Sequence, residues 1–112
     1  MEIDSEFIIA WTTLPHDADV AGFARALIGE RLAACVTTQT PVRSVYRWRG
    51  SVKEDQEQLL TIKTTRDRKA ALWKRLRELH PYEVPEFVVV PVVDGNREYL
   101  DWIRDATVST KG

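Results

Sequence analysis

The segment HPYEVPE, residues 80–86, separates a helical pattern from the apolar run at residues 87–90. Its two prolines fix φ and remove two backbone donors, so neither a helix nor regular strand pairing continues through it. It also carries an imidazole, a phenol and two carboxylates, the densest group of proton- and metal-binding side chains in the chain. We therefore expect a helix to end here, a strand to begin, and any ligand site to use this corner.

A short strand and a helix are predicted near the N-terminus. Residues 7–13 form a β-prone apolar run that Pro15 stops, which indicates a buried strand. Asp17 is placed to cap a helix that Arg31 closes, where a cation suits the helix dipole. The apolar stripe of this helix consists of Val20, Phe23, Ala24 and Leu27.

A long β-hairpin is predicted next. Two β-prone stretches lead from residue 33 to a turn at Arg49 and Gly50, and residues 52–65 return. The outer half of the return, residues 53–57, is too polar for a core. The hairpin should therefore project beyond the domain. A projecting ribbon is marginally stable alone and its edges favour strand pairing, so we expect its tip to contact another subunit.

A second helix, a Val-rich strand and a last helix complete the pattern. Asp67 is expected to cap the second helix, and residues 94–96 to form a turn and cap before the last one. The apolar stripes of the two helices are Leu72, Leu76 and Leu79, and Tyr99, Trp102, Ile103 and Ala106. The order β-α-β-β-α-β with a terminal helix predicts an α+β split βαβ sandwich: an antiparallel sheet with helices on one face.

Composition limits the class of protein. A chain of 112 residues with 44% hydrophobic and 29% charged residues suits one domain, with a core at about 7–107 and a flexible tail at 108–112. The net charge of -1 gives no indication of nucleic acid or an anionic membrane as partner. The apolar runs are too short to span a bilayer, and the acidic N-terminus is unlike a signal peptide. The single cysteine fits a reducing compartment, so we expect a cytoplasmic protein.

Five sequence blocks, in order along the chain, resemble one known family. They are LAACV (32–36), VYRWRG (45–50), LLTIKT (59–64), HPYEVPE (80–86) and YLDWI (99–103). They resemble the CutA proteins, also called divalent-cation tolerance proteins, over nearly the whole chain. The resemblance implies a ferredoxin-like fold, a homotrimer whose hairpins pair between subunits, an architecture like that of the PII signalling trimers, and a role in tolerance to copper or other divalent cations.

This chain keeps only part of the set of copper ligands that is assigned in bacterial members of the family. Copper-binding bacterial members are assigned a cysteine at the end of the first strand and a tandem histidine pair before the proline. Trp11 and Leu79 stand at those positions here, so of that set only His80 is present. Thr37 also replaces a common asparagine, and Arg49 a common acidic residue.

Four residues are candidate ligands for copper or another divalent cation: Cys35, His80, Glu83 and Glu86. Each has a structural alternative. His80 at a helix C-terminus can bond a free carbonyl, Cys35 can be a small buried hydrophobe, and the glutamates can be solvated or paired. His16 follows Pro15 in a loop and is interpreted as a surface side chain.

A ligand cleft and a subunit interface are also predicted. By strand alternation Lys63 shares a face with Glu57, and in a trimer that face, with Tyr82, could line a cleft; the alternative is a Lys–Glu ion pair. Trp48 and Tyr46 on the hairpin and Trp102 on the last helix are interpreted as packing between subunits.

No sequence motif indicates catalysis or an organic cofactor. The chain has no Gly-x-Ser-x-Gly elbow, P-loop or Gly-rich dinucleotide fingerprint. Together with what the CutA resemblance implies, this absence predicts a non-catalytic trimer that binds divalent cations. Two alternatives stay open: a PII-like signalling module that binds a small organic anion in intersubunit clefts, and an assembly scaffold for a partner protein.

Overall fold

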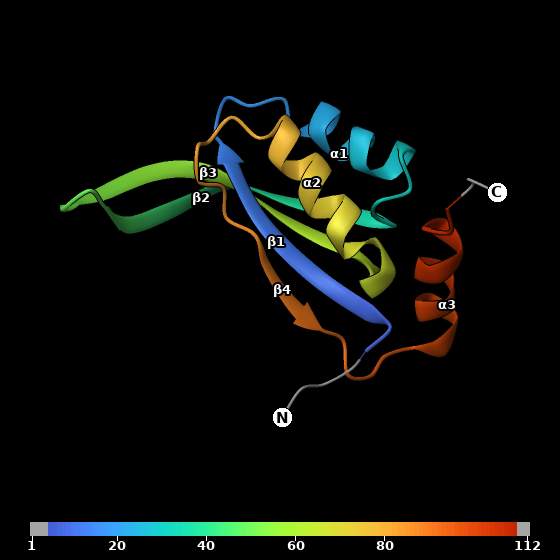
Figure 1. The fold of residues 1–112 in the computed structure, drawn as a ribbon. Helices are drawn as coiled ribbons and strands as arrows, with labels where there is room; N and C mark the ends of the chain where they lie inside the picture. The colour runs from blue at the N-terminus through green and yellow to red at the C-terminus, as the bar shows by residue number, and fades with distance from the viewer. Residues whose placement is uncertain (1–4, 110–112) are drawn as a thin grey trace.

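The computed structural model describes residues 5–109, which form four strands and three α-helices (Figure 1). In chain order they are β1 (Phe7–Pro15), α1 (Val20–Gly29), β2 (Cys35–Trp48), β3 (Ser51–Thr65), α2 (Lys69–Leu79), β4 (Val88–Pro91) and α3 (Arg97–Ala106). This order confirms the predicted α+β class, with the additional helix at the C-terminal end. Residues 110–112 of the predicted flexible tail lie outside the described residues.

The strands form one sheet in the order β2-β3-β1-β4, and every neighbouring pair is antiparallel. β3 and β1 are paired over the whole of β1, from Phe7 opposite Thr65 to Pro15 opposite Glu57. β4 pairs with only four residues of β1 on the other side. This is the ferredoxin-like arrangement that the sequence predicts, because the helices of the two crossover connections, α1 and α2, both pack on the same face of the sheet.

The hydrophobic core lies between the sheet and the helices α1 and α2 (Figure 1). Side chains alternate along each strand, so β1 and β3 turn one set toward the helices. The apolar stripes predicted for both helices are confirmed in their buried members. The core comprises Ala10, Leu14, Phe23, Leu27, Leu32, Ala33, Leu60, Ile62, Leu72 and Leu76. Full burial of a leucine contributes about 1.5–3 kcal/mol, so this layer is the main source of the fold's stability.

The helix α3 lies apart from α1 and α2 and contacts the other face of the sheet at one end. Ile103 packs with Phe7, and Lys63 Nζ donates a hydrogen bond to the Tyr99 hydroxyl at 3.3 Å. Phe7 and Lys63 point away from α1 and α2, by alternation from Ala10 and Ile62. The two helices of the predicted βαβ sandwich, α1 and α2, therefore lie on one face of the sheet, and the additional helix α3 contacts the other.

The predicted helix starts need correction. The N-cap of α1 is Asp19, not Asp17, and its Oδ1 accepts from the Gly22 amide at 3.0 Å. The chain first makes a turn after β1, closed by the Ala18 amide on the Pro15 carbonyl, which places Asp17 too early. Asp67 likewise lies in a 3-10 turn (Arg66–Arg68) that precedes α2, and α2 starts without a side-chain cap. Arg31 is outside α1, which ends at Gly29.

The hairpin projects from the domain as predicted (Figure 1). β1 ends opposite Glu57, so the outer residues of β3 have only β2 as a neighbour. Arg49 and Gly50 have φ of 50° and 82°, the two positive values that a two-residue hairpin turn of type I′ requires. No helix within residues 5–109 is long and apolar enough to cross a membrane.

Candidate ligand cavity beside the hairpin

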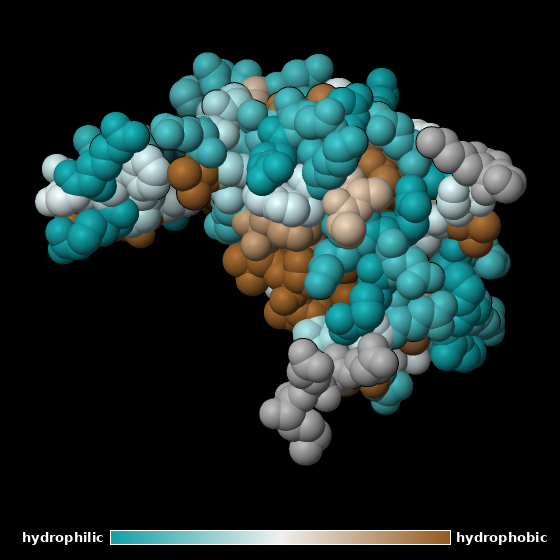
Figure 2. All heavy atoms as spheres, in the orientation of Figure 1, coloured by the Kyte–Doolittle hydropathy of each residue, from teal (hydrophilic) through white to brown (hydrophobic). Residues whose placement is uncertain are grey.

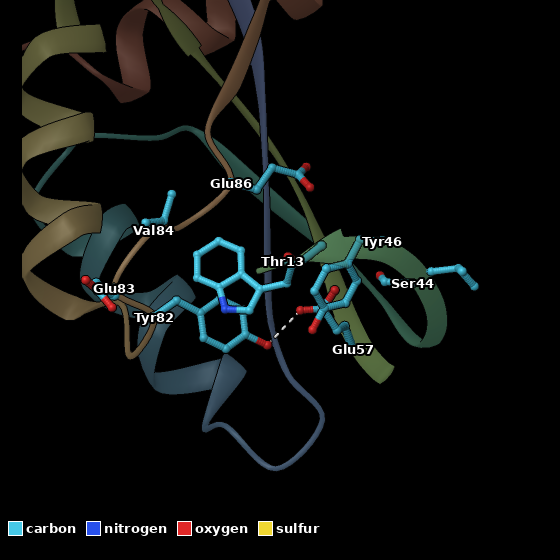
Figure 3. Close-up of a pocket in the computed structure, with 10 residues that line it drawn as sticks. Thr13, Ser44, Tyr46, Glu57, Tyr82, Glu83, Val84 and Glu86 are labelled. Atoms are coloured by element: carbon cyan, nitrogen blue, oxygen red, sulfur yellow. Dashed lines mark hydrogen bonds between the residues drawn. The ribbon is translucent and has the colours of Figure 1, made fainter. Parts of the chain in front are cut away.

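A candidate site is a cavity of about 570 Å³ between the hairpin and the loop that joins α2 to β4 (Figure 3). The two prolines keep this loop out of helix and strand, and its Tyr82 side chain reaches Glu57 of β3. The lining residues are Thr13, Ser44, Val45, Tyr46, Trp48, Glu57, Tyr82, Glu83, Val84 and Glu86. The segment at residues 80–86 is therefore at the cavity, where the sequence places the ligand corner.

Glu57 and Tyr82 form the central polar contact of the cavity. The Tyr82 hydroxyl donates to Glu57 Oε2 at 2.7 Å, across 25 residues of sequence (Figure 3). Glu57 is only 7% exposed, although it is charged. Burial, and then the hydrogen bond to Glu57, raise the pKa of Tyr82, so the phenol stays protonated and remains a donor. The structure thus joins two of the three predicted cleft residues.

The cavity has an excess of negative charge. Glu57, Glu83 and Glu86 all line it, and none of its lining residues is Lys, Arg or His. Burial and the charge of Glu57 raise the pKa of the Glu86 carboxyl. Glu83 contacts Arg49 at 3.5 Å, but both side chains are highly exposed, so that ion pair contributes little.

The hairpin supplies aromatic side chains to the same cavity. Tyr46 lies beside Glu57 in Figure 3, and its hydroxyl bonds to the Asp55 carboxylate, which raises the pKa of Tyr46. Trp48 also lines the cavity, and the Arg49 guanidinium lies 5.4 Å from the centre of its ring. Sequence reasoning missed Asp55. The signal was available, because a two-residue turn at Arg49 and Gly50 fixes the register that places Tyr46 diagonally from Asp55.

His80 is buried beneath the cavity and uses both ring nitrogens. Nε2 lies 2.7 Å from the Thr13 carbonyl, and Nδ1 accepts from the Tyr82 amide at 3.1 Å. These contacts select the tautomer in which Nε2 carries the proton and donates to Thr13. Burial lowers the pKa of His80, so the ring is held neutral. The carbonyl it bonds belongs to β1 rather than to the preceding helix, and neither nitrogen is free for an ion in this arrangement.

The four predicted metal ligands do not converge within one chain. Cys35 is half-buried at the start of β2, opposite Lys63, with Sγ 3.6 Å from Thr37 Oγ1. His80 contacts Thr13, which is opposite Leu59. Four residues along β3 separate those positions by about 13 Å. Residues 5–109 contain no group of three or more His, Cys, Asp or Glu side chains that could hold a metal ion. Metal ligation by this set stays a prediction.

Lys63 is remote from the other two predicted cleft residues. It shares the face of Glu57, as alternation predicts, but lies six residues along β3, about 20 Å away. Its ammonium lies 5.4 Å from the centre of the Tyr99 ring, to which it also donates. Strand alternation predicts which face of the sheet a side chain lies on, but it does not predict that two side chains on that face are close together. His16 is exposed, as expected of a surface side chain.

Comparison with known proteins identifies the family. The family model "CutA1 divalent ion tolerance protein" matches residues 8–106. The chain is 50% identical over 95 residues to the divalent-cation tolerance protein CutA of Thermus thermophilus, an alignment that covers 85% of this chain and 92% of that one. The chain belongs to the CutA1 family.

Other CutA relatives agree. Human protein CutA is 42% identical over 100 residues, which cover 89% of this chain but 56% of the human protein. The crystal structure of CutA from Xylella fastidiosa matches with a TM-score of 0.89 and 39% identity, over 93% of this chain and all of that one. The Thermus thermophilus structure matches with a TM-score of 0.87 and 47% identity, over 91% and 99%. The resemblance indicated by the five sequence blocks is confirmed.

Proposed function

We propose that this CutA1-family protein binds divalent cations, copper among them, as a cytoplasmic homotrimer, and acts in tolerance to them without catalysing a reaction. The family match over residues 8–106 carries the proposal. It gains support from the cavity, because carboxylate oxygens are the ligands that hard divalent cations prefer. The single cysteine, Cys35, has no partner for an intrachain disulfide, which suits a reducing compartment.

The assembly is supported by apolar surface that one chain leaves uncovered. Trp48, Tyr46 and Trp102 are 39%, 41% and 45% exposed, and each is a predicted interface residue. Figure 2 shows apolar surface over β4, where Val88 is 51% exposed. β4 is a four-residue strand at the edge of the sheet, and such an edge accepts a further strand. A second copy covering these residues would bury aromatic side chains of the kind that interfaces favour.

The ligands of a metal site must come either from the carboxylates of the cavity or from two copies of the chain that meet at a subunit boundary. Glu83 and Glu86 already line one cavity, so they can hold an ion together with water. Cys35 and His80 can join such a site only across a boundary between copies, and His80 must first release Thr13 or the Tyr82 amide. We therefore propose weak binding for hard cations and a contribution from Cys35 only for soft ones such as Cu(I).

Isothermal titration of the chelator-treated protein with Cu²⁺, Zn²⁺ and Mg²⁺, after light scattering has established its mass, tests this proposal. We expect a trimer mass, measurable heats for Cu²⁺ and Zn²⁺, and weaker binding in Glu86→Gln. Glu78→Gln, which removes an exposed carboxylate from α2, is the matched control. A monomer mass would refute the proposed trimer. Heats that Cys35→Ala, His80→Ala and Glu86→Gln all leave unchanged would refute the proposed metal ligands.

The cavity does not favour the alternative of a PII-like module that binds a small organic anion. Three carboxylates line it and none of the lining side chains is a cation, so an anion would meet repulsion rather than a counter-charge. For the scaffold alternative, nothing in the described residues identifies a partner protein.

A further inference from the structure

We propose that the outer side of α2 docks a short acidic segment of a partner protein, with Arg77 as the residue that pairs with its carboxylates and with Lys69 and Lys74 as further cations. All three side chains are exposed. This goes beyond the proposed function, because it gives the chemistry of a protein partner and a surface that the metal proposal does not use.

The outer side of α2 is separate from the proposed subunit contacts. Trp102 belongs to α3, which contacts the opposite face of the sheet, and Tyr46 and Trp48 belong to the projecting hairpin (Figure 1). The edge of β4 lies in the plane of the sheet. α2 packs one side on the sheet through Leu72 and Leu76, and its other side faces away from all of these contacts. A trimer formed through them therefore leaves that side of α2 exposed.

The Arg77 guanidinium is held in place by two aromatic rings. The rings of Trp73 and Phe87 stack with their centres 4.8 Å apart, and the guanidinium lies 5.3 Å from the centre of the Trp73 ring. Because Phe87 covers one face of Trp73, the guanidinium lies over the other. A guanidinium that is already stacked loses little freedom when its fork of N–H donors binds a carboxylate. The chain therefore presents a preorganised carboxylate-binding group on α2.

The positive charge of this surface is uncompensated. No Asp or Glu within residues 5–109 forms an ion pair with Lys69, Lys74 or Arg77. The side of α2 that faces α1 differs, because Arg75 there pairs with Glu30 at 3.0 Å. A cluster of unpaired cations favours encounter with an acidic surface and disfavours a basic one. Charge complementarity therefore selects an acidic partner.

The extent of the basic surface favours a short peptide segment over a nucleic acid. From Lys69 to Arg77 the helix rises about 12 Å, which about four residues of an extended chain span. Carboxylates lie at both ends of this stretch: Asp67, Glu78 and Glu83. A continuous polyanion would extend onto them and meet repulsion. Both faces of the Trp73 ring are covered, so no base can stack on it as bases do in single-strand sites.

Fluorescence anisotropy of labelled tetraglutamate, at low ionic strength and in the oligomeric state that light scattering reports, tests the proposal. We expect saturable binding that added salt weakens, and none of tetraglutamine. Arg77→Gln should raise Kd by at least about threefold, the effect of losing one exposed charge-assisted pair. Arg77→Lys keeps the charge without the planar fork, so its Kd should lie between those of wild type and Arg77→Gln. Lys74→Gln should also raise Kd.

Arg25→Gln is the matched control, because it removes the same charge from an exposed position on α1 and should leave Kd unchanged. Absence of saturable binding at millimolar tetraglutamate would overturn the proposal, and so would equal Kd values for Arg77→Gln and Arg25→Gln. Tighter binding of oligothymidylate at the same surface would overturn it in favour of nucleic acid. Arg77→Gln should keep the wild-type mass in light scattering, and a changed mass would place α2 in the subunit interface and overturn the proposal.

Discussion

The Tyr82 hydroxyl and the Glu57 carboxylate, 2.7 Å apart, join the loop after α2 to the strand β3 at the base of the hairpin. The loop has no regular backbone pairing there, so side-chain contacts determine its position. The same Tyr82 contributes its amide to His80 Nδ1, and His80 in turn contacts β1. One tyrosine therefore connects two strands to the loop that forms the cavity.

Tyr82→Phe should destabilise the protein because it leaves the buried Glu57 carboxylate without its phenol donor. The expected cost is about 1–3 kcal/mol, the range for an unsatisfied buried polar group. Chemical denaturation of wild type and variants at the same protein concentration measures it. The cost should shrink when Glu57→Gln is combined with Tyr82→Phe, because the charge is then absent. Additive costs in the double variant would contradict the coupling.

Asp19→Ala should cost about 1 kcal/mol of stability, because Asp19 caps α1 through the Gly22 amide. Asp17→Ala is the matched control: it removes the same side chain two residues earlier, where no helix starts. Thermal or chemical unfolding of the two variants side by side gives the comparison. If Asp17→Ala proves the more damaging of the two, the observed helix start is wrong.

The fold could be predicted because its signals are local. Alternation along the strands, the apolar stripes of the helices and the turn at Arg49 and Gly50 are all read within a few residues. The observed helix starts differ from the predicted ones because a turn closed by the Ala18 amide on the Pro15 carbonyl precedes α1, and a 3-10 turn at Arg66–Arg68 precedes α2. A backbone turn inserted before a helix is not visible from the spacing of candidate capping residues alone.

The candidate site could be predicted only in part, because its contacts are distant in sequence. The sequence places polar chemistry at residues 80–86, and Tyr82 and Glu57 do meet. It does not show that His80 finds its acceptor on Thr13, 67 residues away, or that Lys63 lies too far along β3 to join them. Strand alternation fixes which face of the sheet a side chain lies on. The distance between two residues that are far apart in sequence depends instead on how the loop after α2 packs against the strands.

His80 should make the protein less stable in mild acid. Burial lowers the pKa of the folded ring below its usual value of 6.5. As pH falls through about 6.5, the unfolded chain takes up a proton that the folded ring resists, so stability decreases. His80→Gln, although less stable overall, should lose that part of the pH dependence. His16→Gln, at an exposed position, should keep it. Melting temperatures from pH 7.5 to 5 measure this, and parallel curves for wild type and His80→Gln would contradict it.

Glu86 should have the opposite pH dependence. Burial and the charge of Glu57 raise the pKa of its folded carboxyl above the usual 4.5. The folded state then holds its proton more tightly than the unfolded chain, so stability falls as pH rises above 4.5 and the charged form is a cost at pH 7. Glu86→Gln removes that cost, and its Tm at pH 7 should exceed that of the wild type by on the order of 1–3 °C. The difference should become small near pH 4, where the carboxyl is mostly neutral in both states.

The control is Glu78→Gln, on the exposed face of α2, whose Tm relative to wild type should not change between pH 7 and pH 4. A gain in Glu86→Gln that persists unchanged at pH 4 would show that packing, rather than the uncompensated charge in the cavity, is responsible.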